Sequence, residues 1–172
     1  MDYRIEAISV LLREDCITAR YFPLIPYKES LLHNLLQNQH FTKSDCLALS
    51  EDTLLEMGLP SLELAGLFHS FLVMYDAKPG KFKEIGTAAA NEAEAASFRE
   101  LYLLPGVKAV RAKLYYDAGY QTLESIASAL PEEIIAYTSD VIRQKGLPWK
   151  APLPKEVRTH IAVAKAFTIY AV

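Results

Sequence analysis

Three basic side chains follow a proline–glycine turn in the stretch LPGVKAVRAK, which begins at Leu104. Glycine allows turn conformations that a β-carbon forbids, and the first N–H groups of a helix attract anions. A turn of this type followed by a basic helix could therefore bind a phosphate group. The candidate binding residues are Gly106, Val107, Lys108, Arg111 and Lys113. The alternative is an ordinary corner between packed helices, whose basic residues form a solvated helix face.

A second basic cluster surrounds the only tryptophan of the chain, in and next to the stretch GLPWKAPLPKEVR, which begins at Gly146. Its indole ring could stack on a nucleic-acid base, or it could pack the loop. Residues 99–172 contain 10 Lys/Arg and 7 Asp/Glu, a net charge of +3, whereas residues 1–98 have a net charge of −6. A charge of +3 is small for a nucleic-acid-binding domain. The members of this second cluster are Lys145, Trp149, Lys150, Lys155 and Arg158.

No other residue pattern indicates catalysis or metal binding. The sequence has no glycine-rich P-loop, GxSxG or HExxH motif, and its four histidines lack the spacing of metal ligands. Adjacent acids occur where helices are expected to begin, so the helix dipole accounts for them. We therefore expect a protein that is not an enzyme and that has no metal and no cofactor.

Composition sets the expected location. Cys16 and Cys46 are isolated, which favours buried thiols in a reducing compartment. No apolar run is long enough to cross a membrane, and the first fifteen residues resemble a helix, not a signal peptide. The sequence therefore predicts a cytoplasmic protein with no membrane partner.

Helical periodicity recurs along the whole chain, and strand-like alternation is hard to find. Ser50 is placed as a helix N-cap, and the next glycine, Gly58, should end that helix. A buried helix is expected from Leu62 to Met74. Residues 77–87 combine proline, glycine and charges, which is typical of a linker. The expected fold class is all-α.

An internal repeat divides the chain. When the two halves are aligned without a gap, Pro26 falls on Pro105 and Leu35 on Leu114. The tripeptide GLP also occurs in both halves, each time before a helix. We interpret this as two tandem repeats of short helices, a first repeat at residues 1–76, a linker at 77–87 and a second repeat at 88–172.

The second repeat resembles a known family. The stretch LPGVKAVRAKLYYDAGYQTLESIASALPEE is similar to the helix-hairpin-helix motif of DNA-repair and recombination proteins. The first copy shares the spacing but retains only the proline. The stretch FTKSDCLALSEDTLLEMGLPSLELAGLFHSF also resembles sterile alpha motif domains, which mostly bind proteins. The residues that match the hairpin motif are Leu104, Pro105, Gly106, Val107, Ala112, Leu114, Gly119 and Tyr120.

This resemblance implies that backbone N–H groups of the hairpin bind a DNA phosphate without reading sequence. The second glycine of the family motif is replaced here by Lys108, which adds a charge but also a side chain where the phosphate would approach. The first copy has Pro26, Tyr27 and Lys28 at its hairpin, with no glycine, so we do not expect it to bind phosphate.

Two functions therefore remain open for a non-catalytic binding module. In the first, the second repeat binds a DNA or RNA backbone through its hairpin. In the alternative, the repeats bind a protein partner or another copy of the chain, which the acidic first half and its missing glycines favour. A third possibility is that the first repeat is structural and shields the second.

Overall fold

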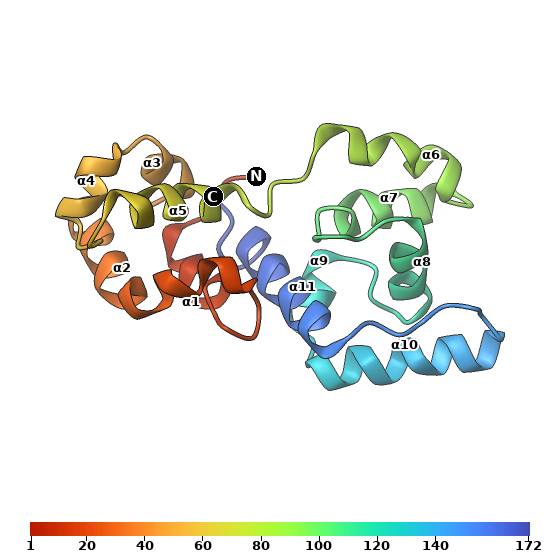
Figure 1. The fold of residues 1–172 in the computed structure, drawn as a ribbon. Coiled ribbons are helices and arrows are strands. Elements are labelled where there is room, and N and C mark those ends of the chain that lie inside the picture. Colours follow the sequence, from red (N-terminus) through yellow and green to blue (C-terminus); the bar gives the residue numbers. More distant parts are fainter. The chain divides into compact units, whose positions relative to one another are not determined.

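The computed structural model describes residues 1–172 and is all-α (Figure 1). It contains eleven α-helices and three 3-10 helices, and no strand. Extended pairing is limited to two isolated bridges, Tyr3 with Ala171 and Arg4 with Thr42. The prediction of an all-α fold is therefore confirmed. None of the helices combines the length and hydrophobicity needed to cross a bilayer.

The chain divides into two compact units. Unit 1 comprises residues 1–75 and 165–172, and unit 2 comprises residues 76–164. The C-terminal residues 165–172 thus belong to the unit formed by the N-terminal half. Residues 77–87, expected to form a linker, are helical from Pro79 onwards and lie in unit 2.

Unit 1 is built from short helices whose ends are set by local side chains. Ser50 caps the helix that begins at Glu51 by accepting a hydrogen bond from the Thr53 N–H group, and Gly58 follows the end of this helix with φ of 110°. The predicted cap and stop are therefore confirmed. The elements are η1 (Ile5–Ala7), α1 (Ile8–Leu11), η2 (Ala19–Tyr27), α2 (Lys28–Gln37), α3 (Lys43–Leu47), α4 (Glu51–Glu56) and α5 (Leu62–Val73).

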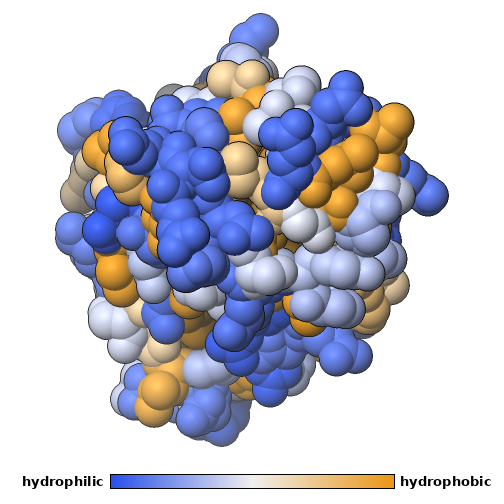
Figure 2. Space-filling model, turned by 90° about the vertical axis from the view of Figure 1, so that its left-hand side faces the viewer, coloured by the Kyte–Doolittle hydropathy of each residue, from blue (hydrophilic) through white to orange (hydrophobic).

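Aromatic side chains of α5 and η2 form the centre of unit 1. The rings of Tyr21 and Phe71 meet edge to face at 5.8 Å, and the Tyr21 hydroxyl is 3.1 Å from the hydroxyl of Ser70. The C-terminal segment closes on the N-terminus, where the Arg4 N–H group donates to the Tyr170 carbonyl. Both cysteines are buried and form no disulfide. Viewed from the left-hand side of Figure 1, the surface is mostly hydrophilic, with separate hydrophobic patches (Figure 2).

Unit 2 contains the hairpin with the better match to the family motif. Fully buried Phe98 and Tyr102 stack with their ring centres 6.0 Å apart, and Leu104 and Val107 extend this core under the hairpin. Burial of these four side chains fixes the position of the chain between its two flanking helices. The elements are η3 (Pro79–Glu84), α6 (Ile85–Ala88), α7 (Glu92–Leu101), α8 (Ala109–Asp117), α9 (Leu123–Ala127), α10 (Pro131–Lys145) and α11 (Pro154–Phe167), which continues into unit 1 from Lys165.

The same local hydrogen bonds occur at corresponding positions of both units. After α2 and after α8 the chain turns through a residue with positive φ, Gln39 at 63° and Gly119 at 95°. Thr42 and Thr122 then form capping boxes at the starts of α3 and α9. The backbone N–H bonds of the two turns run from Gln39 to Leu36, His40 to Leu35, Gly119 to Tyr116 and Tyr120 to Tyr115. This structural register is displaced by a single position from the ungapped sequence alignment.

Candidate nucleic-acid interface

The hairpin of unit 2 is an exposed turn on a buried base. Gly106 is exposed and has φ of 70°, a left-handed conformation that favours glycine. Val107 next to it is fully buried, and its N–H group donates to the Leu104 carbonyl at 3.3 Å. Val107 therefore anchors the turn and is not available to a ligand, in contrast to its expected role as a binding residue.

The start of α8 presents unpaired donors. Lys108 is the N-cap residue but makes no side-chain cap, and the N–H groups of Gly106, Lys108 and Ala109 have no acceptor within the protein. The φ of Lys108 is −130°, an extended conformation that any residue adopts, so this position does not require glycine. Lys108 is exposed. The turn therefore offers backbone donors and one ammonium group to solvent.

Two side chains from other elements hold the carbonyls of the turn. Lys81 of η3 donates to the Leu104 carbonyl at 2.7 Å, and His160 of α11 lies with Nε2 2.8 Å from the Pro105 carbonyl. Because a carbonyl only accepts, Nε2 carries the proton, and Nδ1 accepts from the Tyr115 hydroxyl at 2.6 Å. Burial lowers the pKa of His160 to about 4, so this histidine is neutral at pH 7.

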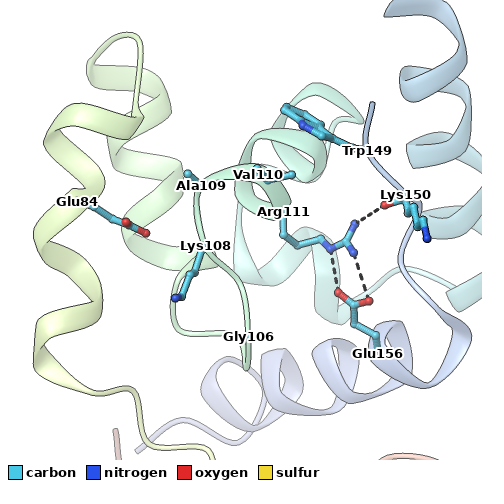
Figure 3. A pocket seen from close by; sticks show the side chains of 9 residues that line it. All are labelled: Glu84, Gly106, Lys108, Ala109, Val110, Arg111, Trp149, Lys150 and Glu156. Atoms are coloured by element: carbon cyan, nitrogen blue, oxygen red, sulfur yellow. Dashed lines mark hydrogen bonds and ion pairs between the residues drawn. The ribbon is translucent and has the colours of Figure 1, made fainter. Parts of the chain in front are cut away.

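A groove of about 540 Å³ opens beside the turn (Figure 3). Such a volume is within the usual range of small-molecule binding sites. Figure 3 shows Lys108 and Glu84 on one side of the groove and Trp149 with Lys150 on the other. The residues that line it are Glu84, Gly106, Lys108, Ala109, Val110, Arg111, Trp149, Lys150 and Glu156.

Arg111 is held inside this groove by protein groups. Its guanidinium pairs with both carboxylate oxygens of Glu156, at 2.8 and 3.3 Å, and donates to the Lys150 carbonyl at 3.2 Å. The side chain retains 20% of its exposure. Arg111 therefore connects α8 to α11 and to the loop before α11, and its charge is largely neutralised by Glu156.

Lys113, the third basic residue after the turn, lies outside the groove. It pairs with Glu94 of α7 and with Asp117 of its own helix, the latter at 3.1 Å. Its hydrogen bond with Glu94 raises the pKa of Lys113, and the same bond, followed by one from the Ala90 N–H group, lowers the pKa of Glu94. Lys113 thus stabilises the packing of α7 on α8.

The second basic cluster is divided by the fold. Trp149 and Lys150 line the groove, whereas Lys145 pairs with Asp117 at 2.9 Å. Lys155 and Arg158 are exposed on α11 and do not line the groove. Of the ten candidate residues, the structure therefore gathers Gly106, Lys108, Arg111, Trp149 and Lys150 around one groove.

The corresponding turn of unit 1 is constructed differently. Pro26 and Tyr27 lie inside η2, which passes directly into α2, and neither has positive φ. The Lys28 ammonium group donates to the Leu12 carbonyl at 3.2 Å. This turn presents no left-handed residue and no unengaged cation.

No pattern in the sequence assigned four further residues to this site. Lys81 and His160 support the turn, and Glu84 and Glu156 add carboxylates to the groove. Each lies more than twenty residues from Gly106 along the chain, so only the tertiary fold shows what it contacts. No group of three or more His, Cys, Asp or Glu residues is arranged to bind a metal ion.

The chain matches no protein family, and neither curated proteins nor solved structures show significant similarity to it. The function is therefore inferred from the geometry of the site itself.

Proposed function

We propose that this chain is a non-catalytic module of two related helix-hairpin-helix-like repeats, and that unit 2 binds the backbone of a nucleic acid. The observation that carries the proposal is the exposed turn at Gly106–Lys108, where backbone N–H groups without partners lie beside a lysine with no ion-pair partner. A phosphate diester is the anion that such a site fits, because it accepts several hydrogen bonds and carries a full charge.

The proposal of two repeats is supported by the hydrogen bonds that recur in the same register after α2 and after α8. The GLP tripeptides add a second correspondence, since Leu59 donates to Leu54 and Leu147 donates to Ile142 in the same type of helix-ending turn. Under this proposal only the second repeat retains an open hairpin.

The electrostatics of the turn favour an anion. Lys81 supports the Leu104 carbonyl, and its pKa is lowered by burial and then by the positive charge of Lys108. Two ammonium groups therefore act on the same turn. The two carboxylates that line the groove are already engaged, Glu156 with Arg111 and Glu84 with the Tyr102 hydroxyl. This arrangement suits phosphate contacts without sequence readout.

Charge reversal at Lys108 tests the proposal. We expect Lys108→Glu to weaken binding of a fluorescein-labelled oligonucleotide roughly tenfold at low salt, and to reduce the salt slope by about one. Fluorescence anisotropy against increasing salt measures both. Lys78→Glu is the matched control, because it changes the net charge equally at an exposed position that does not line the groove.

The proposal fails if the wild-type protein binds neither DNA nor RNA at low salt. It also fails if both variants lose affinity equally, since the effect would then be one of net charge and not of the turn.

The alternative function is assembly with a protein partner or with another copy of the chain. It is favoured by the ion pairs that neutralise Arg111 and Lys113, and by the charge of unit 2, which is +1 against −4 for unit 1. Light scattering on the purified protein distinguishes the two. A stable oligomer with no affinity for nucleic acid would support assembly.

A further inference from the structure

The groove beside the hairpin combines features that a phosphate alone does not need. An aromatic ring, Trp149, lines it together with the exposed apolar side chain of Val110, which retains 49% of its exposure. Lys108 and Lys150 lie in the same groove, and neither ammonium group has an ion-pair partner. An aromatic surface between cations suits a ligand with a flat ring and a phosphate.

The backbone next to the tryptophan is held by the fold. Arg111 donates to the carbonyl of Lys150, the residue directly after Trp149, and is itself held by Glu156 (Figure 3). Because this hydrogen bond joins the loop to α8, the backbone beside Trp149 is restrained at the groove before any ligand binds. Such preorganisation lowers the entropy lost on binding.

Charges within the groove influence where the phosphate of a ligand would lie. Lys108, Arg111 and Lys150 oppose the two carboxylates of Glu84 and Glu156, which leaves an excess of one positive charge. Glu84 lies across the groove from Trp149 (Figure 3). Glu84 repels an anion, so the phosphate is placed away from this carboxylate, between Lys108 and Lys150, and the uncharged ring lies against Trp149.

We propose that this groove accepts an unpaired nucleotide, with its base against Trp149 and its phosphate between Lys108 and Lys150. The inference rests on the proposed function and narrows it, because the ligand becomes single-stranded DNA or RNA. In a duplex the base faces are covered by their neighbours, so the ring of Trp149 would have no base to contact.

The experiment uses the full chain, whose single tryptophan makes intrinsic fluorescence a direct report on the groove. The probes are a labelled oligothymidylate of about ten nucleotides and its duplex with oligodeoxyadenylate. We expect the single strand to bind more tightly than the duplex and to quench Trp149 fluorescence in a saturable, salt-dependent manner. Trp149→Leu should lose on the order of tenfold in affinity for the single strand.

Trp149→Phe is the matched variant, because it retains an aromatic face and should retain most of the affinity. Circular dichroism establishes whether each variant is folded. If a variant is not folded, the fluorescence quenching of the wild-type protein still tests whether a base contacts Trp149. Equal binding of both probes with unchanged fluorescence overturns this inference but leaves backbone binding intact. Absence of binding to either probe refutes the proposed function itself.

Discussion

At the scale of single residues, Gly106 and Lys108 contribute different properties to the turn. Gly106 supplies the left-handed backbone, with φ of 70°, and apart from its two chain neighbours no residue has an atom within 4 Å of where a β-carbon would be. Lys108 has an extended backbone, so a side chain imposes no strain at this position, where the helix-hairpin-helix motif that the sequence resembles has a glycine. Lys108 therefore adds a charge to the turn without backbone strain.

His160 is the residue whose protonation state the turn depends on. Its ring is buried between the Pro105 carbonyl and the Tyr115 hydroxyl, with Nε2 donating and Nδ1 accepting. Proton uptake would place a charge in this buried site, near Arg111 and Lys81, both of which disfavour it. Glu156 acts in the opposite direction but is already paired.

Stability of unit 2 should therefore fall in mild acid. An unfolded histidine titrates near ~6.5, whereas burial lowers the pKa of folded His160 to about 4. The unfolded state consequently binds more protons between these values, and stability is lost as the pH falls from about 7 towards 4. We expect a loss on the order of 3 kcal/mol from His160, measured by urea unfolding with Trp149 fluorescence.

His160→Gln provides the reference for this prediction. Carboxylates such as Glu94, whose pKa is lowered in the fold, also lose their contribution in acid, but they do so in both proteins. The difference between wild type and variant isolates the histidine. Parallel loss of stability in the two proteins would contradict the assignment.

At the scale of elements, the contact between α8 and α11 determines the shape of the groove. The pair of Arg111 and Glu156 is bidentate, and the side chains retain 20% and 33% of their exposure. The carboxylate also accepts from the Leu153 N–H group at 3.3 Å, next to the start of α11. The ion pair between Arg111 and Glu156 thus links α8 to the start of α11 and to the loop that contains Lys150.

A double-mutant cycle measures this contact. With Arg111→Gln, Glu156→Gln and the double variant, we expect a coupling free energy of about 1 kcal/mol, because the pair is partly shielded from water. The same cycle on Arg99 and Glu92, which retain 57% and 81% of their exposure, should give about 0.3 kcal/mol or less. Equal coupling free energies in the two pairs would show that the ion pair of Arg111 and Glu156 does not stabilise the contact between α8 and α11.

Local signals made the elements predictable and left the partners of charged residues hidden. Ser50, Gly58 and the apolar run from Leu62 define helix ends through contacts only a few residues apart, so the sequence suffices. Lys113 instead contacts Glu94 of the preceding helix, and Arg111 contacts Glu156, three helices further along the chain. A count of basic residues in the sequence therefore overestimates the number available to a ligand, because Lys113 and Arg111 are paired with carboxylates.

At the scale of the whole molecule, the two units share local structure but differ at the hairpin. Lys28 corresponds to Lys108 in the structural register, yet its ammonium group donates to Leu12 and its turn lies within η2. Unit 1 carries 6 Lys/Arg against 10 Asp/Glu, and unit 2 carries 12 against 11. Under the proposed function, unit 1 is the half that does not bind nucleic acid.

The hairpin and Trp149 could each be identified in the sequence as candidate binding features. Their proximity in space could not be predicted. The PG turn marks the first, and a lone tryptophan among lysines, distant from Gly106 along the chain, marks the second. Their meeting in one groove depends on how α8, α10 and α11 pack, which no local pattern encodes. The division of the chain at residue 165 is hidden for the same reason.

The most direct test observes the backbone N–H groups themselves. In a nitrogen–proton correlation spectrum of the labelled protein, an oligothymidylate is added stepwise at low salt. The account predicts the largest shifts at Gly106, Lys108 and Ala109, with the indole of Trp149 responding in parallel and the turn around Lys28 unchanged. Shifts confined to unit 1, or a spectrum of unit 2 that does not change, would contradict it.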